Sequence, residues 1–341
     1  MTPPSAYSTS GVDIEAGNRA TQLMTEAVRS TYGREVLAGI GAFGGLYDAS
    51  ALKQMDAPVL VASTDGVGTK TKVAARLNRW ETIGQDLVNH CVNDILVQGA
   101  RPLFFLDYVA SSRLNPEQIA AIVGGVATAC RAVSCALLGG ETAEMPGVYE
   151  SGEIDLAGTI VGTVERKQLI DGKRIQAGDV ILALPSSGLH TNGYSLARRA
   201  LADLNWDEML PELGCSIGDA LLAVHRSYLT AVECLWSASV DIRGLAHITG
   251  GGVIDNLPRI FPSGVGAVIQ RSTWAEPPIF GLIQEMAGVS DEEMFHVFNM
   301  GLGMLIVVAA DQVALAKTTL PEITQVGVIV DGDGSVSVEQ G

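Results

Sequence analysis

Apolar and polar positions recur along the chain with two spacings, which predict both helices and strands. Residues 81–98 have helical spacing, with apolar side chains that can face a core at Leu87, Val88, Cys91, Ile95 and Leu96. Polar side chains recur about every turn on another stripe of this segment, at Asp86, His90, Asn93 and Asp94. The pattern predicts a mostly buried helix that carries polar groups along one side.

The same spacings predict the other helices and strands of the chain. Further helices are predicted at residues 18–32, 116–133, about 192–203, about 218–238 and 252–260, and Asn115 followed by Pro116 is a typical helix start. Strands are predicted at residues 58–64, 102–110, 154–165, 180–185, 265–270, 302–310 and 324–331. Residues 135–147 are predicted to form a strand followed by a glycine-rich turn.

Strands alternate with helices in both halves, so each half is expected to form an α/β or mixed α+β layer. A chain of 341 residues is long for one hydrophobic core, which favours two domains. The stretch 167–179 is polar and rich in turn-forming residues, and we place the boundary near residue 170. The predicted domains are therefore residues 1–170 and residues 171–341.

Charge narrows the range of partners. The net charge of −16 argues against nucleic acid, because no general basic surface can form. Small anions remain possible where basic side chains gather, at Lys70, Lys72, Arg76 and Arg79.

Cysteine usage and hydropathy indicate the compartment. The five cysteines are odd in number and form no CxxC motif, which is typical of buried thiols in a reducing compartment. The first ten residues have neither a basic start nor an apolar core, so we expect no signal peptide. No apolar run is long enough to span a bilayer. We expect a soluble cytoplasmic protein with no membrane partner.

Three acidic side chains lie beside backbone turns or on the buried helix. Asp65 follows a predicted strand, Asp94 lies on the polar stripe, and Glu141 follows the sequence LLGG. Three carboxylates in one domain suit Mg²⁺, which binds a few carboxylate oxygens together with water and substrate phosphates. The alternative is that Asp65 and Glu141 cap helices or form turns, and that Asp94 is solvated.

Glycine-rich loops accompany these acids. The loop GIGAFGG at 39–45 and the pair Gly139 and Gly140 allow backbone N–H groups to approach an anion closely. Lys70 closes the stretch STDGVGTK at 63–70, which lacks the spacing of a P-loop. Lys70 can meet a phosphate, although a single lysine is more often a surface residue.

The second half carries two turns suited to phosphate. In PSSGLHTNGYS a strand ends, hydroxyl side chains follow, and a helix begins near Asn192. Helix N-termini bind phosphate through free N–H groups, and Ser186, Ser187, Thr191 and Asn192 can also donate hydrogen bonds to it directly. The alternative is ordinary helix capping by Thr191 or Asn192. HITGGG at 247–252 repeats the pattern with His247, as the first loop has His190. We interpret His225 and His296 as structural or surface residues, and His90 as part of the helix stripe.

These motifs occur in an order that closely resembles one enzyme family, the phosphoribosylformylglycinamidine cyclo-ligases. The resemblance covers the chain from about residue 7 to near the C-terminus, and it rests on GVDIEAGN, STDGVGTK, VNDILVQGARPLFFLDY, GGETAEMPG, SSGLHTNGYSL, HITGGG and FNMGLGM. The departures are small: Leu189 and Thr191 stand in a loop that often reads Gly-Pro-His-Ser-Asn, and threonine keeps the hydroxyl.

The resemblance implies an activity and an assembly. The family closes the imidazole ring of formylglycinamidine ribonucleotide with ATP, giving ADP and phosphate, after ATP phosphorylates the amide oxygen and an amidine nitrogen attacks. The family is homodimeric, with the sheets of the N-terminal domains paired into a barrel and ATP bound near that contact. The N-terminal domain would bind ATP and Mg²⁺, and the layered C-terminal domain would bind substrate.

The resemblance also implies roles for individual residues. Mg²⁺ would be held by Asp65, Asp94 and Glu141. ATP would contact Asp13, Gly41, Gly44, Gly45, Gly66, Gly68, Thr69, Lys70, Gly139 and Gly140. The substrate would contact Ser187, Gly188, His190, Thr191, Asn192, Gly250, Gly251 and Gly252. Lys70, His190 and His247 would be catalytic, and the sequence does not choose which histidine carries the proton.

Two rival functions follow from the same residues. Thiamine-monophosphate kinase and selenophosphate synthetase share the acid-and-glycine ATP site, but the two histidine loops favour the cyclo-ligase, and a reactive N-terminal cysteine is missing. A non-catalytic nucleotide-binding scaffold is the other rival. Such a chain would be expected to lose one of Asp65, Asp94, Glu141 or Lys70, and all four are present.

Overall fold

The computed structural model describes residues 13–340, which divide into two compact units. Unit 1 contains the described residues up to Ile95 together with Arg101–Arg166. Unit 2 contains Leu96–Ala100 and the described residues from Lys167 onward. The roles predicted for the two halves stay predictions at this point.

Unit 1 is built from a four-stranded sheet, a two-stranded sheet and helices. Its elements in chain order are α2 (Ile14–Arg29), β1 (Val36–Ala38), β2 (Leu46–Tyr47), the 3-10 helix η1 (Ala49–Gln54), β3 (Pro58–Gly66), α3 (Lys70–Leu77), α4 (Glu81–Leu96), β4 (Arg101–Ser111), α5 (Pro116–Ala132), β5 (Ala136–Glu144) and β6 (Ile154–Glu165). The predicted helices and strands of this half are present, and α5 begins after Asn115, whose side chain accepts from the N–H of Gln118.

The main sheet has the strand order β3-β6-β4-β5, in which only β4 and β5 are parallel. One row of facing residues crosses all four strands: Asp65 on β3, Gly158 on β6, Asp107 on β4 and Gly140 on β5. Facing residues on neighbouring strands project to the same side of a sheet. This row therefore places two carboxylates and two glycines on one face.

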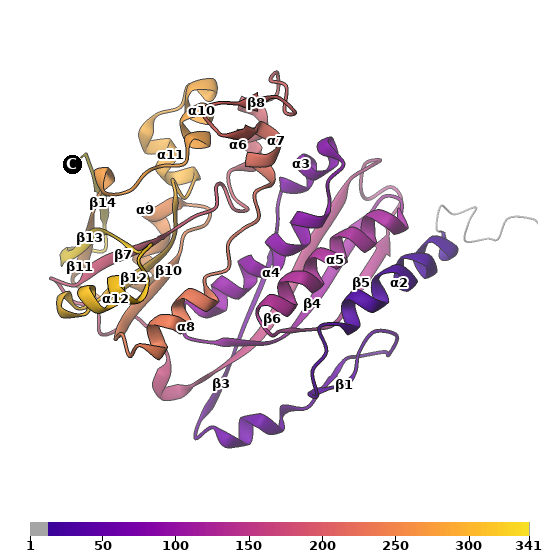
Figure 1. Cartoon of the computed structure of the whole chain (residues 1–341), viewed down its shortest axis with the longest axis horizontal. Coiled ribbons are helices and arrows are strands. Elements are labelled where there is room, and N and C mark those ends of the chain that lie inside the picture. The colour runs from indigo at the N-terminus through magenta and orange to yellow at the C-terminus, as the bar shows by residue number, and fades with distance from the viewer. Residues whose placement is uncertain (1–12, 341) are drawn as a thin grey trace, which may run out of the picture. The chain divides into compact units, whose positions relative to one another are not determined.

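Helices α4 and α5 lie across one face of this sheet (Figure 1). A side chain at Gly158 would collide with Leu87 of α4 and with Phe105. The helices approach each other closely as well, because a Cβ atom at Gly125 would overlap the backbone carbonyl of Glu81. Glycine at these positions lets the helices pack near enough to exclude water from the core.

The opposite face of the sheet exposes apolar side chains. Leu60 on β3 is 61% exposed and Leu106 on β4 is 37% exposed. Along β3 the odd-numbered residues 59, 61 and 63 are less exposed than Leu60, Ala62 and Thr64, which is the period-two pattern of a sheet with one open face.

Unit 2 contains a second, larger sheet. Its elements are the 3-10 helices η2 (Arg166–Gln168, at the junction), η3 (Leu257–Ile260), η4 (Arg271–Thr273) and η5 (Ala310–Gln312), the strands β7 (Val180–Pro185), β8 (Met209–Leu210), β9 (Cys215–Ser216), β10 (Ile242–His247), β11 (Val265–Gln270), β12 (Leu302–Val308), β13 (Thr324–Asp331) and β14 (Val336–Glu339), and the helices α6 (Tyr194–Ala200), α7 (Ile217–Leu222), α8 (Leu229–Ser237), α9 (Gly252–Asn256), α10 (Pro278–Ala287), α11 (Asp291–Val297) and α12 (Val313–Thr319).

The large sheet has the order β10-β12-β7-β13-β11-β14. All seven residues of β12 are buried, as are five of the six residues of β7. Strands this apolar on both faces are covered on both faces. Unit 2 therefore forms a layered α/β structure, as predicted for the C-terminal half.

Two predicted elements differ from the structure, and other elements of the structure were not predicted. The helix predicted at 218–238 is two helices, because the segment between α7 and α8 is held by other contacts: Ser187 donates to the carbonyl of Val224 (2.5 Å), and His225 is fully buried. The turn predicted after residue 138 is instead the middle of β5, which continues to Glu144. The strand β10 was not predicted. No helix within residues 13–340 is long and apolar enough to cross a membrane.

The two adjacent glycines of α5 give a test of the helix packing. Gly125→Ala should lower the free energy of unfolding by about 1–3 kcal/mol, because the added methyl overlaps the Glu81 carbonyl. Gly124→Ala is the matched control, since no atom lies within 4 Å of its Cβ position, and it should raise stability by about 0.5–1 kcal/mol. Urea unfolding monitored by circular dichroism would measure both, and equal effects would contradict the packing.

Candidate active site

The polar stripe of α4 places three charged groups inside unit 1 at a spacing of four residues: Asp86, His90 and Asp94. His90 Nε2 lies 2.8 Å from Asp65 Oδ2 and 3.6 Å from Asp94 Oδ2, so one imidazole joins a carboxylate of β3 to a carboxylate of α4. Ser63 Oγ donates to Asp94 Oδ2 at 3.2 Å. The stripe predicted from the sequence is therefore present; Asp86 and His90 are buried, and Asp94 is partly exposed.

The pKa of His90 is raised. Burial opposes its protonation, but the hydrogen bond with Asp65 and the charges of Asp94, Asp65 and Asp86 outweigh the burial. An imidazolium can balance two neighbouring carboxylates that would otherwise repel each other. The side chains of Asp65 and Asp94 are 41% and 25% exposed, so both remain accessible to a cation. Each carboxylate lies against the imidazole, which stands between them. Carboxylate and hydroxyl oxygens are ligands of the kind that Mg²⁺ binds.

Glu141 does not join this pair within one chain. It faces Tyr108 on β4, one residue beyond the row that contains Asp65, and therefore projects to the other face of the sheet. Three strand spacings separate β3 from β5, roughly 14 Å. The structure brings Asp65 and Asp94 together and leaves Glu141 at the opposite edge.

Lys70 differs most from its expected position. It is fully buried at the start of α3, and its Nζ atom lies 2.8 Å from Asp86 Oδ2, which is also fully buried. Burial lowers the pKa of Lys70, and the charge and hydrogen bond of Asp86 act in the opposite direction. The ammonium group is thus part of a buried ion pair and not of an open turn, so a contact with phosphate would require the pair to separate.

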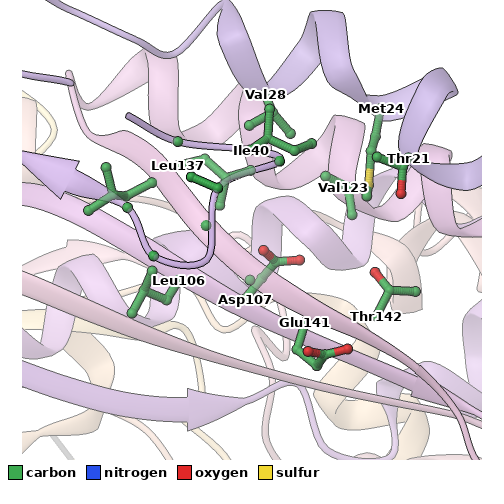
Figure 2. Close-up of a pocket in the computed structure, with 18 of the residues that line it drawn as sticks. Thr21, Met24, Val28, Ile40, Leu106, Asp107, Val123, Leu137, Glu141 and Thr142 are labelled. Carbon is green, nitrogen blue, oxygen red and sulfur yellow. The ribbon is translucent and has the colours of Figure 1, made fainter. Parts of the chain in front are cut away.

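A cavity of about 780 Å³ opens beside the glycine-rich loop 39–45. Its lining comes from α2, the loop, β4, α5 and β5, and Figure 2 shows the Asp107 carboxyl among the apolar side chains of this site. The predicted ATP residues Gly41, Gly44, Gly45, Gly139, Gly140 and Glu141 all line it. Gly41 has a φ of 93°, a conformation that glycine adopts without strain.

The remaining predicted ATP residues lie elsewhere in unit 1. Asp13 caps α2, because its side chain accepts from the N–H of Ala16 at 3.0 Å. Gly66 ends β3, and the turn from there to α3 contains Gly68, with a φ of 53°, and Thr69. Gly66, Gly68 and Thr69 lie next to Asp65 in the chain, and neither they nor Asp13 belong to the cavity lining.

In unit 2 the loop after β7 presents a histidine in a strained conformation. His190 has a φ of 61°, its Nε2 accepts from the N–H of Ser187 at 3.2 Å, and the carbonyl of Gly188 accepts from Asn299 at 2.9 Å. A positive φ in a non-glycine residue costs about 1–3 kcal/mol and occurs often at functional sites. Thr191 and Asn192 do not cap α6, since that helix begins after Gly193 and has no side-chain cap.

Three buried histidines form a cluster in unit 2. The His190 and His225 rings are stacked with centroids 3.9 Å apart, and His225 Nε2 lies 3.0 Å from His247 Nε2. Thr191 Oγ1 lies 3.4 Å from His225 Nδ1. Ligand atoms of the three histidines lie within 4.8 Å of one another, but nearly parallel stacked rings do not direct their nitrogens at one ion. The arrangement therefore suits proton sharing better than metal binding.

Sequence reasoning missed two residues of this site. His225 stands in a segment with no glycine or turn signal, so only the tertiary contacts reveal that it touches both predicted histidines. Asn256 holds the second glycine turn, because its Nδ2 donates to the carbonyls of Gly250 at 3.1 Å and Gly252 at 2.8 Å. Gly251 and Gly252 have φ values of 94° and 59°, which explains the glycines at these positions.

Comparison with family models identifies the class of protein. Residues 47–164 match the N-terminal domain of AIR synthase related proteins, and residues 176–339 match the C-terminal domain. The two matches together cover most of the chain and agree with the mixed α/β fold of both units. The chain belongs to the AIR synthase related proteins.

Individual relatives narrow the family. A protein from Desulfitobacterium hafniense named phosphoribosylformylglycinamidine cyclo-ligase is 52% identical over 315 residues, which is 92% of each chain. A protein of the same name from Geobacillus thermodenitrificans is 50% identical over 336 residues, or 96% of each chain. The chain therefore belongs to the phosphoribosylformylglycinamidine cyclo-ligase family, as its motifs predict, and it is a ligase.

Solved structures share the fold at low identity. The thiamine-monophosphate kinase of Stenotrophomonas maltophilia has a TM-score of 0.67 at 20% identity, with 93% of this chain and 96% of that chain covered. The hydrogenase maturation protein HypE in complex with ATP has a TM-score of 0.67 at 18% identity, with 94% of this chain and 91% of that chain covered. At these identities the likeness shows a common fold.

The buried ion pair gives a test of what Lys70 does. Lys70→Met should lower the free energy of unfolding by about 3–5 kcal/mol, because it leaves the Asp86 carboxylate buried without its partner. The double variant Lys70→Met with Asp86→Leu should recover most of this loss, since both charges are then removed. Urea unfolding would measure both. If the double variant is no more stable than the single variant, the pair is not the reason that Lys70 is buried.

Proposed function

We propose that the protein closes the imidazole ring of formylglycinamidine ribonucleotide to give aminoimidazole ribonucleotide, ADP and phosphate, a step of de novo purine biosynthesis. The observation that carries the proposal is the high identity to cyclo-ligases over more than nine-tenths of both chains. The site geometry supports it, since unit 1 offers a cation-binding acid pair and a nucleotide-sized cavity, and unit 2 offers a histidine cluster.

In this proposal unit 1 binds ATP and Mg²⁺. The fold occurs in a solved protein with ATP, and the 39–45 loop lines a cavity with apolar walls. Asp65 and Asp94 would hold Mg²⁺, and Ser63 would orient Asp94. When bound, Mg²⁺ neutralises the charge on the transferred phosphoryl group. Asp65, Asp94 and the 39–45 loop would position the phosphates and exclude water from them.

A homodimer would complete the site. The cavity and Glu141 lie at the β5 edge of the sheet, whereas Asp65 and Asp94 lie about 14 Å away at the β3 edge. The open face carries the exposed side chains of Leu60 and Leu106, which a second copy of the sheet could bury. Two sheets packed in this way would bring the cavity edge of one subunit near the acid pair of the other.

The reaction needs one phosphoryl transfer and one proton removal. Transfer from ATP to the amide oxygen makes phosphate the leaving group; attack by the amidine nitrogen then forms the C–N bond, expels phosphate and releases a proton. Ser187, His190, Thr191, Asn192 and the glycines 250–252 would bind the substrate. The His225–His247 hydrogen bond requires one donor and one acceptor, so this pair can take up a proton and share it.

The first experiment follows ADP and the imidazole product together in purified protein. One imidazole for each ADP, only with Mg²⁺ and only with formylglycinamidine ribonucleotide, is the expected result. Asp65→Asn should lower kcat/KM for ATP by about a hundredfold or more, because one of the two proposed Mg²⁺ carboxylates is lost. Asp203→Asn, at an exposed carboxylate of unit 2, is the control. ADP without imidazole would point to a kinase of the same fold.

The histidine cluster predicts unequal effects of two substitutions at His225. Glutamine can reproduce the position of Nε2, which faces His247, and asparagine the position of Nδ1, which faces Thr191. His225→Asn should lower kcat by about ten- to a hundredfold and shift the pH profile of kcat, while His225→Gln should retain more activity and a profile nearer that of the unsubstituted protein.

His296→Gln is the matched control for this pair, because His296 is partly exposed on α11 and lies outside the cluster. It should leave kcat and its pH profile unchanged. Equal losses in the two His225 variants, with an unchanged pH profile, would mean that His225 only fills space.

A further inference from the structure

A buried carboxylate that the proposed chemistry does not use lies in the unit 1 cavity. Asp107 stands in the middle of β4, is 9% exposed and lines the cavity. Within residues 13–340 the one donor recorded for its carboxyl group is the backbone N–H of Asp107 itself. A carboxyl held in this way in the core costs stability unless something supplies the missing donors.

The sheet leaves room for this carboxyl by placing glycine on both sides of it. Asp107 faces Gly158 on β6 and Gly140 on β5. A Cβ atom at Gly140 would overlap Asp107 Oδ1, so the carboxyl lies directly over that glycine. In Figure 2 the Asp107 carboxyl points toward the part of the cavity where Ile40 and Val123 lie. The carboxyl is thus directed at space between apolar walls.

Burial also raises the pKa of Asp107 to about 7. Near neutral pH the carboxyl is therefore partly protonated. In either form it keeps a carbonyl or carboxylate oxygen that can accept a hydrogen bond. A flat apolar ligand that carries an N–H donor would match both the carboxyl and the apolar walls around it.

We infer that Asp107 recognises the base of the nucleotide by accepting a hydrogen bond from its exocyclic amino group. This inference rests on the proposed use of ATP and adds the orientation of the nucleotide. A flat heteroaromatic ring fits between the apolar walls formed by Val28, Ile40, Val123 and Leu137. The 6-amino group of adenine then meets Asp107.

The test compares ATP with purine riboside 5′-triphosphate, which differs only in lacking the 6-amino group. The unsubstituted protein should bind ATP at least about tenfold more tightly by titration calorimetry, because the analogue leaves the buried carboxyl without a donor. Asp107→Ala should bring the two dissociation constants to within about threefold. Asp107→Asn keeps an acceptor oxygen and should retain most of the preference.

Two further variants keep the test independent of folding defects. Gly140→Ala leaves the carboxyl in the chain but fills the space beneath it, and should reduce the preference for ATP. Thr128→Val changes an exposed polar side chain of α5 that does not line the cavity, and should leave the ratio of the two constants unchanged. Circular dichroism would establish that each variant is folded before its binding is measured.

The outcomes separate this inference from the proposed function. If Asp107→Ala keeps the preference for ATP, or the unsubstituted protein shows none, the assignment of Asp107 is overturned while ATP-dependent ring closure can stand. If neither nucleotide binds and no imidazole forms, the proposed function fails and the assignment fails with it. A preference lost in Asp107→Ala and kept in Asp107→Asn would support the assignment.

Discussion

The polar stripe of α4 is the constraint on which unit 1 depends. Asp86 and His90 lie on a helix that packs against the sheet, and each needs a partner because a buried charge without one is costly. Lys70 of α3 neutralises Asp86, and the carboxylates of Asp65 and Asp94 flank His90. The same contacts that hold α3 and β3 against α4 also place the carboxylates of Asp65 and Asp94 on the two sides of one imidazole.

Unit 2 uses a comparable arrangement without acids. The loop after β7, the segment before α8 and the end of β10 each contribute one histidine to the cluster. The break between α7 and α8 places His225 between His190 and His247. The interruption of the helix is therefore what allows the histidine cluster to form. In both units, polar groups that would destabilise a core singly are paired, and the pairs lie where chemistry is proposed.

Much of the fold could be predicted from the sequence, because strong periodicity and start signals dominate elements such as α4, α5 and β6. The divided helix at 218–238 could not, since its break depends on hydrogen bonds to a distant loop. At the site, the sequence indicated Asp65, Asp94, His190 and His247. It did not indicate that Lys70 forms a buried ion pair with Asp86, that Asp107 lines a cavity, or that Glu141 projects from the face of the sheet opposite Asp65. Each of these depends on strand register and helix packing.

The central claim is that ATP activates the amide oxygen of the substrate before the ring closes. The most direct measurement is the fate of that oxygen, using formylglycinamidine ribonucleotide labelled there with oxygen-18 and mass spectrometry of the released phosphate. The account predicts that one labelled oxygen appears in each inorganic phosphate formed. Label recovered in water, with unlabelled phosphate, would contradict it.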